Sequence, residues 1–236
     1  MATLATAAQT ADPGRPVTRR PLVILGGGEH ARVVADAARS SPDSWELVGF
    51  GTADATEPPD TGLGLPWLGD DAAVERWLAG RRPAERASLV LGFGAAAPAR
   101  AAVADGFPAA DWATLVHATA TVSPSAVLGA GAVVLAGAVI NAGARIGTHA
   151  IVNSAAVVEH DVVVGPFAHL GPGVVVGGGA TIGAATHVGL GAIVRDHVTV
   201  GERVTVGMGA VVVADVPDGE TVVGNPAARL ERPAGG

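Results

Sequence analysis

From Val116 to Val212 the chain carries an aliphatic residue at every sixth position without a break. Gly often follows this residue directly, and Ala often stands two positions before it. In a chain that is 49% hydrophobic, seventeen consecutive aliphatic positions in one of six phases have a chance probability on the order of 10⁻⁵. The positions are Val116, Val122, Leu128, Val134, Ile140, Ile146, Val152, Val158, Val164, Leu170, Val176, Ile182, Val188, Val194, Val200, Val206 and Val212.

A period of six matches neither an α-helix nor a flat strand, but it is the hexapeptide repeat of a parallel β-helix. Three repeats make one triangular coil of 18 residues. The aliphatic side chain points inward, and Gly or Asn tolerates the tight turn at each corner. The repeats predict about 5.3 coils, a stack roughly 26 Å tall. Resemblance to known hexapeptide-repeat proteins implies a left-handed winding, an exception to the usual crossover rule.

Residues 21–112 follow a different pattern, in which strand and helix signals alternate. Apolar runs predict strands at 21–25, 45–50 and 88–91, and helical spacing predicts helices at 29–40, 71–79 and 98–104. Gly26, Gly27 and Gly28 follow the first strand. This order predicts a small Rossmann-like α/β domain with a glycine-rich first turn.

After Val213 the six-residue period ends, and residues 214–219 predict a turn. A short strand at 221–223 and the run Gly224-Asn225-Pro226 follow. Because the open end of a solenoid needs a cover, we interpret this segment as a cap. We therefore expect a flexible tail at 1–19, the Rossmann-like domain at 20–112, the left-handed β-helix at 113–214, and a C-terminal cap and tail at 215–236.

Composition excludes several classes of function for this 236-residue chain. Apolar stretches are interrupted well before the roughly 18 residues of a membrane helix, so we expect no membrane association. There is no Cys, and all 15 basic residues are Arg. Disulfides, thiol nucleophiles, a phosphate-binding lysine and a Schiff base are therefore excluded. A net charge of −7 argues against nucleic acid as a partner, and the N-terminus lacks a signal-peptide pattern. We expect a cytoplasmic protein.

Stacking of residues 18 apart indicates which side chains share an edge. His169 should lie beneath His187, and His160 beneath Gly178. Glu159 precedes His160 at a corner position where nine other repeats have Gly. A carboxylate beside an imidazole can orient it and raise its basicity, as general base catalysis requires. The alternative is a solvated surface pair.

Two other kinds of site are weakly indicated. Zinc prisms of the γ-carbonic-anhydrase type use two His five residues apart, and no two His in the repeats have that spacing. We therefore expect no metal. The run Gly26-Gly27-Gly28-Glu29-His30-Ala31 fits G-x-G-x-x-A, which suits an anion at a helix N-terminus or only a tight turn. Gly51-Thr52-Ala53 follows the second strand where a ribose-binding acid would stand, which argues against NAD.

From about residue 20 to 230 the chain resembles the bacterial sugar O- and N-acyltransferases typified by NeuD and PglD, which carry hexapeptide repeats. The resemblance is carried by Gly26-Gly27-Gly28-Glu29-His30 and by Asn153-Ser154-Ala155-Ala156-Val157-Val158-Glu159-His160-Asp161. Gly165-Pro166-Phe167-Ala168-His169 and Val223-Gly224-Asn225-Pro226-Ala227 complete it. The chain departs from the family at Gly51-Thr52-Ala53, where acids are usual, and at Ala228, where a basic residue is usual.

The resemblance implies an acetyl-CoA-dependent transferase that works as a homotrimer, with active sites between neighbouring prisms. By the same resemblance, His160 is the general base and Glu159 its partner, and Asn153 and His169 line the acceptor pocket. Gly26, Gly27, Gly28 and His30 would hold a sugar or sugar nucleotide in an acceptor-binding domain. Gly177, Gly178, Gly207, Asn225 and Pro226 would line the CoA cleft.

The expected reaction is direct acyl transfer to an amine or a hydroxyl of a sugar-like acceptor, with backbone N–H groups near Gly178 stabilising the oxyanion. A metal-dependent hydratase and a non-catalytic binding scaffold are the alternative functions. The choice between amine and hydroxyl, the acceptor itself and the size of the acyl group stay open.

Overall fold

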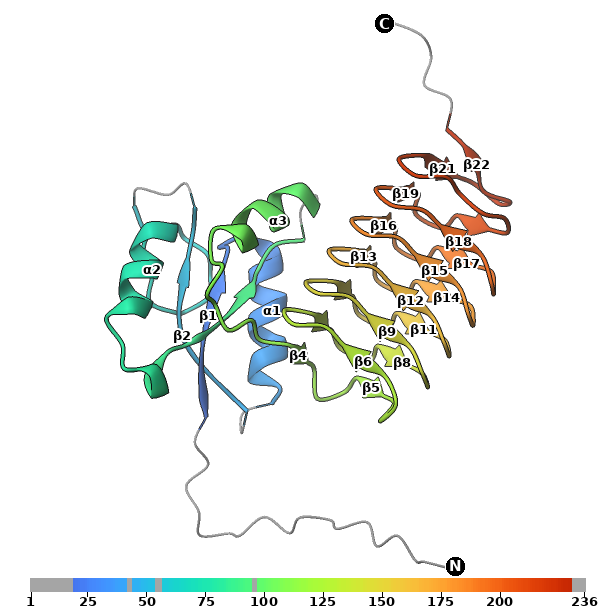
Figure 1. Cartoon of the computed structure of the whole chain (residues 1–236). Coiled ribbons are helices and arrows are strands. Elements are labelled where there is room, and N and C mark those ends of the chain that lie inside the picture. The colour runs from blue at the N-terminus through green and yellow to red at the C-terminus, as the bar shows by residue number, and fades with distance from the viewer. Residues whose placement is uncertain (1–18, 42–43, 54–56, 95–96, 231–236) are drawn as a thin grey trace, which may run out of the picture.

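The computed structural model describes residues 19–41, 44–53, 57–94 and 97–230. Most of the expected tail at 1–19 and the last six residues of the expected cap lie outside this description. Figure 1 shows an α/β region beside a long solenoid, with a strand pair at the far end of the solenoid. None of the described helices has the length and apolar character to cross a membrane.

The N-terminal region is a three-stranded parallel sheet with helices on it. Its strands are β1 (Arg20–Leu25), β2 (Trp45–Gly51) and β3 (Ser88–Leu91), in the order β2-β1-β3. Its helices are α1 (Glu29–Arg39), α2 (Asp71–Ala79), α3 (Ala97–Asp105) and the single 3-10 turn η1 (Pro83–Glu85). The predicted α/β succession is confirmed, with element ends that differ by at most one residue.

The repeats form a parallel solenoid of about six turns, an arrangement that fits a left-handed β-helix. Each coil contributes one two-residue strand to each of three faces, except that the last coil adds none to the third face. The first face contains β4 (Leu115–Val116), β7 (Val133–Val134), β10 (Ile151–Val152), β13 (His169–Leu170), β16 (His187–Val188) and β19 (Thr205–Val206). The second contains β5 (Thr121–Val122), β8 (Val139–Ile140), β11 (Val157–Val158), β14 (Val175–Val176), β17 (Ile193–Val194) and β20 (Val211–Val212). The third contains β6 (Val127–Leu128), β9 (Arg145–Ile146), β12 (Val163–Val164), β15 (Thr181–Ile182) and β18 (Thr199–Val200).

The six-residue pattern predicted the inward series correctly. The second residue of each of these strands points into the solenoid, and Val158, Leu170 and Val176 are fully buried there. Strands pair in parallel with the strand one coil away, as in Val157 opposite Val175. Residues 18 apart therefore lie one above the other along the whole stack.

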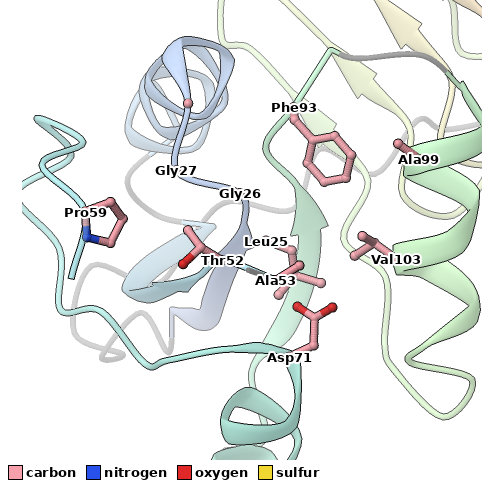
Figure 2. A pocket seen from close by; sticks show the side chains of 11 residues that line it. Leu25, Gly26, Gly27, Thr52, Ala53, Pro59, Asp71, Phe93, Ala99 and Val103 are labelled. Atoms are coloured by element: carbon pink, nitrogen blue, oxygen red, sulfur yellow. The ribbon is translucent and has the colours of Figure 1, made fainter. Parts of the chain in front are cut away.

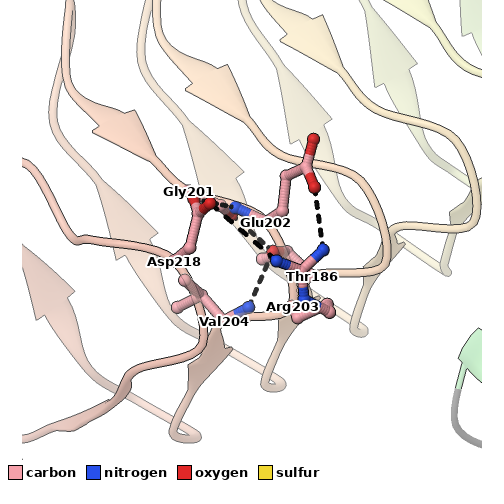
Figure 3. A network of polar contacts seen from close by, with 6 residues as sticks. All are labelled: Thr186, Gly201, Glu202, Arg203, Val204 and Asp218. Atoms are coloured by element: carbon pink, nitrogen blue, oxygen red, sulfur yellow. Dashed lines mark hydrogen bonds and ion pairs between the residues drawn. The ribbon is translucent and has the colours of Figure 1, made fainter.

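The last coil is covered by β21 (Thr221–Val223) and β22 (Ala228–Arg229). Polar contacts join the chain beneath this cover to the coils before it (Figure 3). The hydroxyl of Thr186 donates to the carbonyl of Gly201 at 2.6 Å and accepts from the backbone N–H of Val204 at 3.0 Å. The carboxylate of Asp218 accepts from the N–H of Glu202 at 2.8 Å. The two bonds of Thr186 thus join successive coils, and the carboxylate of Asp218 ties the cap to the stack by satisfying a main-chain N–H.

The α/β region packs on the first face of the solenoid. Helix α1 contacts β4, and the buried side chains of Val34, Leu115 and Leu135 belong to one hydrophobic cluster with the sheet. A second contact lies two coils further along, where Phe167 packs against the cluster around β3 and Trp112. Two separate attachments therefore fix the α/β region to the stack.

Close stacking makes some corner glycines irreplaceable. A Cβ on Gly165 would lie 2.5 Å from the backbone nitrogen of Ala184, one coil away. A Cβ on Gly173 would meet nothing within 4 Å, although the φ of that residue is +67°. Other corners hold non-glycine residues at such angles, for example Ala155 at 55° and Ala185 at 58°.

We expect Gly165→Ala to lower the free energy of unfolding much more than Gly173→Ala. The first variant forces two backbones apart, whereas the second costs only the left-handed conformation, about 1–2 kcal/mol. Urea unfolding of both variants measures the difference. Equal losses of unfolding free energy in the two variants would contradict the close backbone contact between successive coils at Gly165.

Candidate active site

The glycine turn between β1 and α1 forms one wall of a pocket of about 520 Å³ (Figure 2). Gly26, Gly27 and Gly28 line it together with Thr52 from the end of β2. Ala99 and Val103 project into it from α3, and Asp71 from the start of α2. Gly28 is the N-cap of α1, and a Cβ there would meet nothing within 4 Å, so the helix N-terminus is open to an anionic group.

His30, also expected to bind the acceptor, is not among the residues that line this pocket. Its ring lies 6.2 Å from the ring of His169, centroid to centroid. Burial, followed by the positive charge of Arg100, lowers the pKa of His30, and its Nε2 is buried without a hydrogen-bond partner. The histidine of the glycine motif therefore faces the solenoid.

Asn153 and His169, predicted to share a pocket, are in direct contact. The Asn153 Oδ1 accepts from the backbone N–H of Ser154 at 2.8 Å, which directs the amide Nδ2 toward His169 Nε2 at 3.2 Å. Because an amide NH₂ only donates, Nε2 is the accepting nitrogen and Nδ1 carries the proton. Burial, aided by the neighbouring charges of His187, Arg100 and His30, lowers the pKa of His169 from 6.5 to about 3. His169 is a neutral imidazole at physiological pH.

A second pocket, of about 300 Å³, lies between α3 and the first face of the solenoid. His169 and His187 line it from successive coils, with ring centroids 5.0 Å apart. Arg100 and Gly94 line it from the α/β region, and Thr186 from the solenoid. We call this space the interdomain pocket.

His160 lies elsewhere, at the corner between the second and third faces. Its Nδ1 lies 3.0 Å from the carboxylate Oδ2 of Asp161. The carboxylate bonded to the imidazole is thus that of Asp161, not the expected Glu159. This hydrogen bond raises the pKa of His160, and the charges of Asp161 and then Glu159 raise it further. A carboxylate accepts only, so Nδ1 carries the proton and Nε2 presents a lone pair.

The glycine above His160 is held close to the ring. A Cβ on Gly178 would lie 2.6 Å from His160 Nε2, so the imidazole packs against the bare backbone of the next coil. Gly177 occupies the same corner, where a Cβ would lie 2.5 Å from the backbone nitrogen of Asp196. Both glycines expected to bind CoA therefore share the edge of His160.

The other residues expected to bind CoA lie on a different edge. Gly207 follows β19, at the corner between the first and second faces. Asn225 and Pro226 lie between β21 and β22, joined by a cis peptide bond, and the neighbouring Gly224 accepts from the N–H of Val211. Apart from the glycine turn of the α/β region, the expected site residues of one chain fall into two groups, one on the edge of His160 and one around the first face.

The residues that the structure describes contain no cluster of three or more His, Cys, Asp or Glu side chains able to hold a metal ion. Sequence reasoning missed two members of the site. Asp161 follows His160 directly within the resemblance motif, so its place in the chain was a usable signal. Arg100 gave no signal, because an arginine in a surface-like helix pattern does not indicate burial.

Solved structures of sugar acetyltransferases are similar to almost the whole chain. Perosamine N-acetyltransferase from Caulobacter crescentus, a variant with one histidine replaced by asparagine in complex with CoA and GDP-perosamine, is 35% identical with a TM-score of 0.80. The match covers 90% of this chain and 97% of that one. The acetyltransferase domain of PglB from Neisseria gonorrhoeae, in complex with acetyl coenzyme A, is 36% identical with a TM-score of 0.79. That match covers 90% of this chain and all of the domain, 100%.

WeeI from Acinetobacter baumannii is 20% identical with a TM-score of 0.65, which shows a shared fold. No protein-family model and no curated protein sequence matches the chain.

We expect the stability of the protein to fall as the pH drops below about 6.5, the ordinary pKa of histidine. The pKa values of His30, His149, His169 and His187 are all lowered in the fold. Below that pH the unfolded chain therefore binds more protons than the native one. For His169 the stabilisation is complete above pH 6.5 and is lost progressively toward its native value of about 3.

Thermal unfolding between pH 5 and pH 8 measures this dependence. His169→Gln should show a shallower loss of Tm on acidification than the parent chain. His117→Gln, in the first coil and outside the cluster, is the matched control and should keep the parent slope. An identical pH dependence in His169→Gln and the parent would contradict the burial of a neutral imidazole.

Proposed function

Because the chain belongs to the family of bacterial sugar acetyltransferases built on a hexapeptide-repeat β-helix, we propose that it transfers the acetyl group of acetyl-CoA to the amino group of a nucleotide-linked aminosugar. The observation that carries this proposal is the match over nine-tenths of the chain to an enzyme bound to CoA and GDP-perosamine, at 35% identity. It is supported by the open helix N-terminus at the glycine turn, which suits a diphosphate.

The N-terminal residues 20–112 are proposed to hold the acceptor. Their parallel sheet and glycine turn support a Rossmann-like assignment, and in that fold ligands bind at the carboxyl ends of the strands. The 520 Å³ pocket lies at that edge of the sheet, beside Gly26, Gly27 and Gly28. The interdomain pocket continues from Gly94 toward His169, a path by which the sugar would reach the solenoid.

His160 is proposed as the general base. Its Nε2 would accept a proton from the acceptor amine as the amine nitrogen attacks the thioester carbonyl carbon. Backbone N–H groups beside Gly178 would stabilise the negative oxygen of the tetrahedral intermediate. The carbon–sulfur bond then breaks, and the imidazolium returns its proton to the leaving sulfur, so that an amide and free CoA are formed. Asp161 and Glu159 keep His160 basic through their charges.

A homotrimer would unite the two groups of site residues. The outward side chains of the second face form an apolar row, and Val175 and Ile193 are 36% and 44% exposed in it. The corner between the first and second faces adds Leu190 and Met208, which are 54% and 74% exposed. Contiguous apolar surface of this kind usually marks an interface.

Consider a trimer in which the second faces of three copies meet around a three-fold axis. Each second face ends in two edges, one shared with the first face and one shared with the third. The first-face edge of one copy then lies against the third-face edge of the next copy. His160, Gly177 and Gly178 of one copy would then face Asn153 and His169 of its neighbour. Gly207, Asn225 and Pro226 would lie across the same cleft. The 113–214 solenoid and the 215–236 cap are therefore proposed to bind CoA between subunits.

We expect His160→Ala to reduce acetyl transfer by about 10²-fold or more, the usual effect of removing a general base. The assay is thiol release from acetyl-CoA with a panel of nucleotide-linked aminosugars that includes GDP-perosamine. Asp161→Asn should have a smaller effect on the plateau rate and should shift the acid limb of kcat/KM to lower pH. The reason is that the loss of the carboxylate lowers the pKa of His160.

His117→Ala replaces a histidine of the first coil, far from the cleft, and should leave the rate unchanged. CoA affinity should also be unchanged in His160→Ala, because that residue is assigned to proton transfer. Normal turnover by His160→Ala with an active acceptor would contradict the assignment of the base.

A further inference from the structure

Arg100 is a buried cation without a carboxylate partner. It lies on α3, is 1% exposed, and forms no ion pair with any acidic residue in the described parts of the chain. Burial lowers its pKa to about 10, so it is still protonated at neutral pH. Burying an unpaired charge is costly, which calls for a specific role.

The guanidinium bonds instead to two main-chain carbonyls of the solenoid. One terminal nitrogen donates to the carbonyl of Phe167, and the other lies 3.5 Å from the carbonyl of His149. These two residues are 18 apart and occupy the same corner in successive coils, with φ angles of 56° and 55°. Their rings stack at a centroid distance of 4.9 Å, and Trp112 meets His149 edge-on at 4.6 Å. A planar fork of N–H groups is suited to bridging two such acceptors.

The bridge attaches α3 to the corner that carries His169. Phe167 precedes His169 by two residues, so its carbonyl sits at the base of the strand that presents the imidazole. On its other side α3 presents Ala99 and Val103 to the 520 Å³ pocket (Figure 2). One helix therefore forms a wall of both pockets, and one side chain fixes that helix to the solenoid.

The charge of Arg100 also acts on the surrounding imidazoles. The ionisable groups around His169 are His30 from α1, Arg100 from α3 and His187 from the next coil. Arg100 contributes to the lowered pKa of all three histidines, after the larger effect of burial. The positive charge of Arg100 thus disfavours protonation of His169 and His187, the two histidines of the first face that line the interdomain pocket.

We propose that Arg100 is a positioning residue, which bridges two successive corners of the solenoid and so fixes α3 and His169 on opposite sides of the interdomain pocket. The part of this inference that concerns acceptor binding rests on the proposed acetyltransferase function. The part that concerns the charge of Arg100 does not, because the titration of the neighbouring histidines can be measured without turnover.

Two substitutions of Arg100 separate the effect of its planar guanidinium geometry from the effect of its positive charge. Arg100→Lys keeps the positive charge but replaces the planar fork with a single ammonium, which is not suited to both carbonyls. Arg100→Met keeps much of the apolar stem and removes the charge. Arg145→Met is the matched control, because Arg145 is an exposed outward residue of β9 on the third face.

The first measurement is an NMR pH titration of the histidine ring protons in the full chain. Arg100→Met should raise the pKa of His169 and His187, whereas Arg100→Lys and Arg145→Met should leave both near the parent value. Unchanged histidine titrations in Arg100→Met would overturn the conclusion that the charge of Arg100 lowers the pKa of His169 and His187. If Arg100→Met does not fold, Arg100→Gln, which keeps a planar amide without charge, replaces it and must show the same shift.

The second measurement is steady-state acetyl transfer with an acceptor that the parent chain uses. Both Arg100 variants should raise KM for the acceptor by about 10- to 100-fold, the scale of a misplaced binding wall. KM for acetyl-CoA should stay within about 2-fold of the parent value, a change much smaller than the tenfold or greater increase expected for the acceptor. Equal losses for both substrates, or full recovery of acceptor KM in Arg100→Lys, would overturn the positioning role. If no acceptor is acetylated by the parent chain, the proposed function fails while the titration still tests the effect of the Arg100 charge on the histidines.

Discussion

The main-chain hydrogen bonds between successive coils, which hold residues 18 apart in register, are the constraint on which the rest of the structure depends. They place His187 above His169 and Gly178 above His160, and they align the carbonyls of His149 and Phe167 at one corner. Each site residue of the solenoid takes its position from a coil, whereas Arg100 and His30 come from helices of the α/β region. A rigid stack of this kind can hold reacting groups with little conformational freedom, which favours catalysis by orientation.

The groups around the first face show how burial sets the chemistry. Three imidazoles and a guanidinium are gathered between α3 and the solenoid, and desolvation keeps the imidazoles neutral. His160, exposed at another corner and bonded to Asp161, is made more basic instead. Two environments on one solenoid thus separate a proton-accepting histidine from histidines suited to neutral hydrogen bonding.

The repeat period was sufficient to predict the solenoid, because an inward aliphatic residue every six positions has no other structural explanation. The glycine turn was also anticipated, whereas the resemblance implied only that Asn153 and His169 line one pocket, not that their side chains touch. The pairing of His160 with Asp161 was not, because the corner conformation, with φ of 59° at Asp161, decides which neighbouring carboxylate reaches the ring. The role of Arg100 depends on how α3 meets the solenoid, a long-range contact without a local sequence pattern.

We propose that the active site is completed by a second copy of the chain, with His160 from one subunit and His169 from the next. Co-expression of His160→Ala and His169→Gln chains tests it most directly, since each variant alone should be nearly inactive. Random mixing gives intact pairs at about a quarter of the interfaces in a cyclic trimer, so the mixed protein should regain about a quarter of the parent activity. Folded mixed trimers that stay as inactive as the single variants would contradict a shared site.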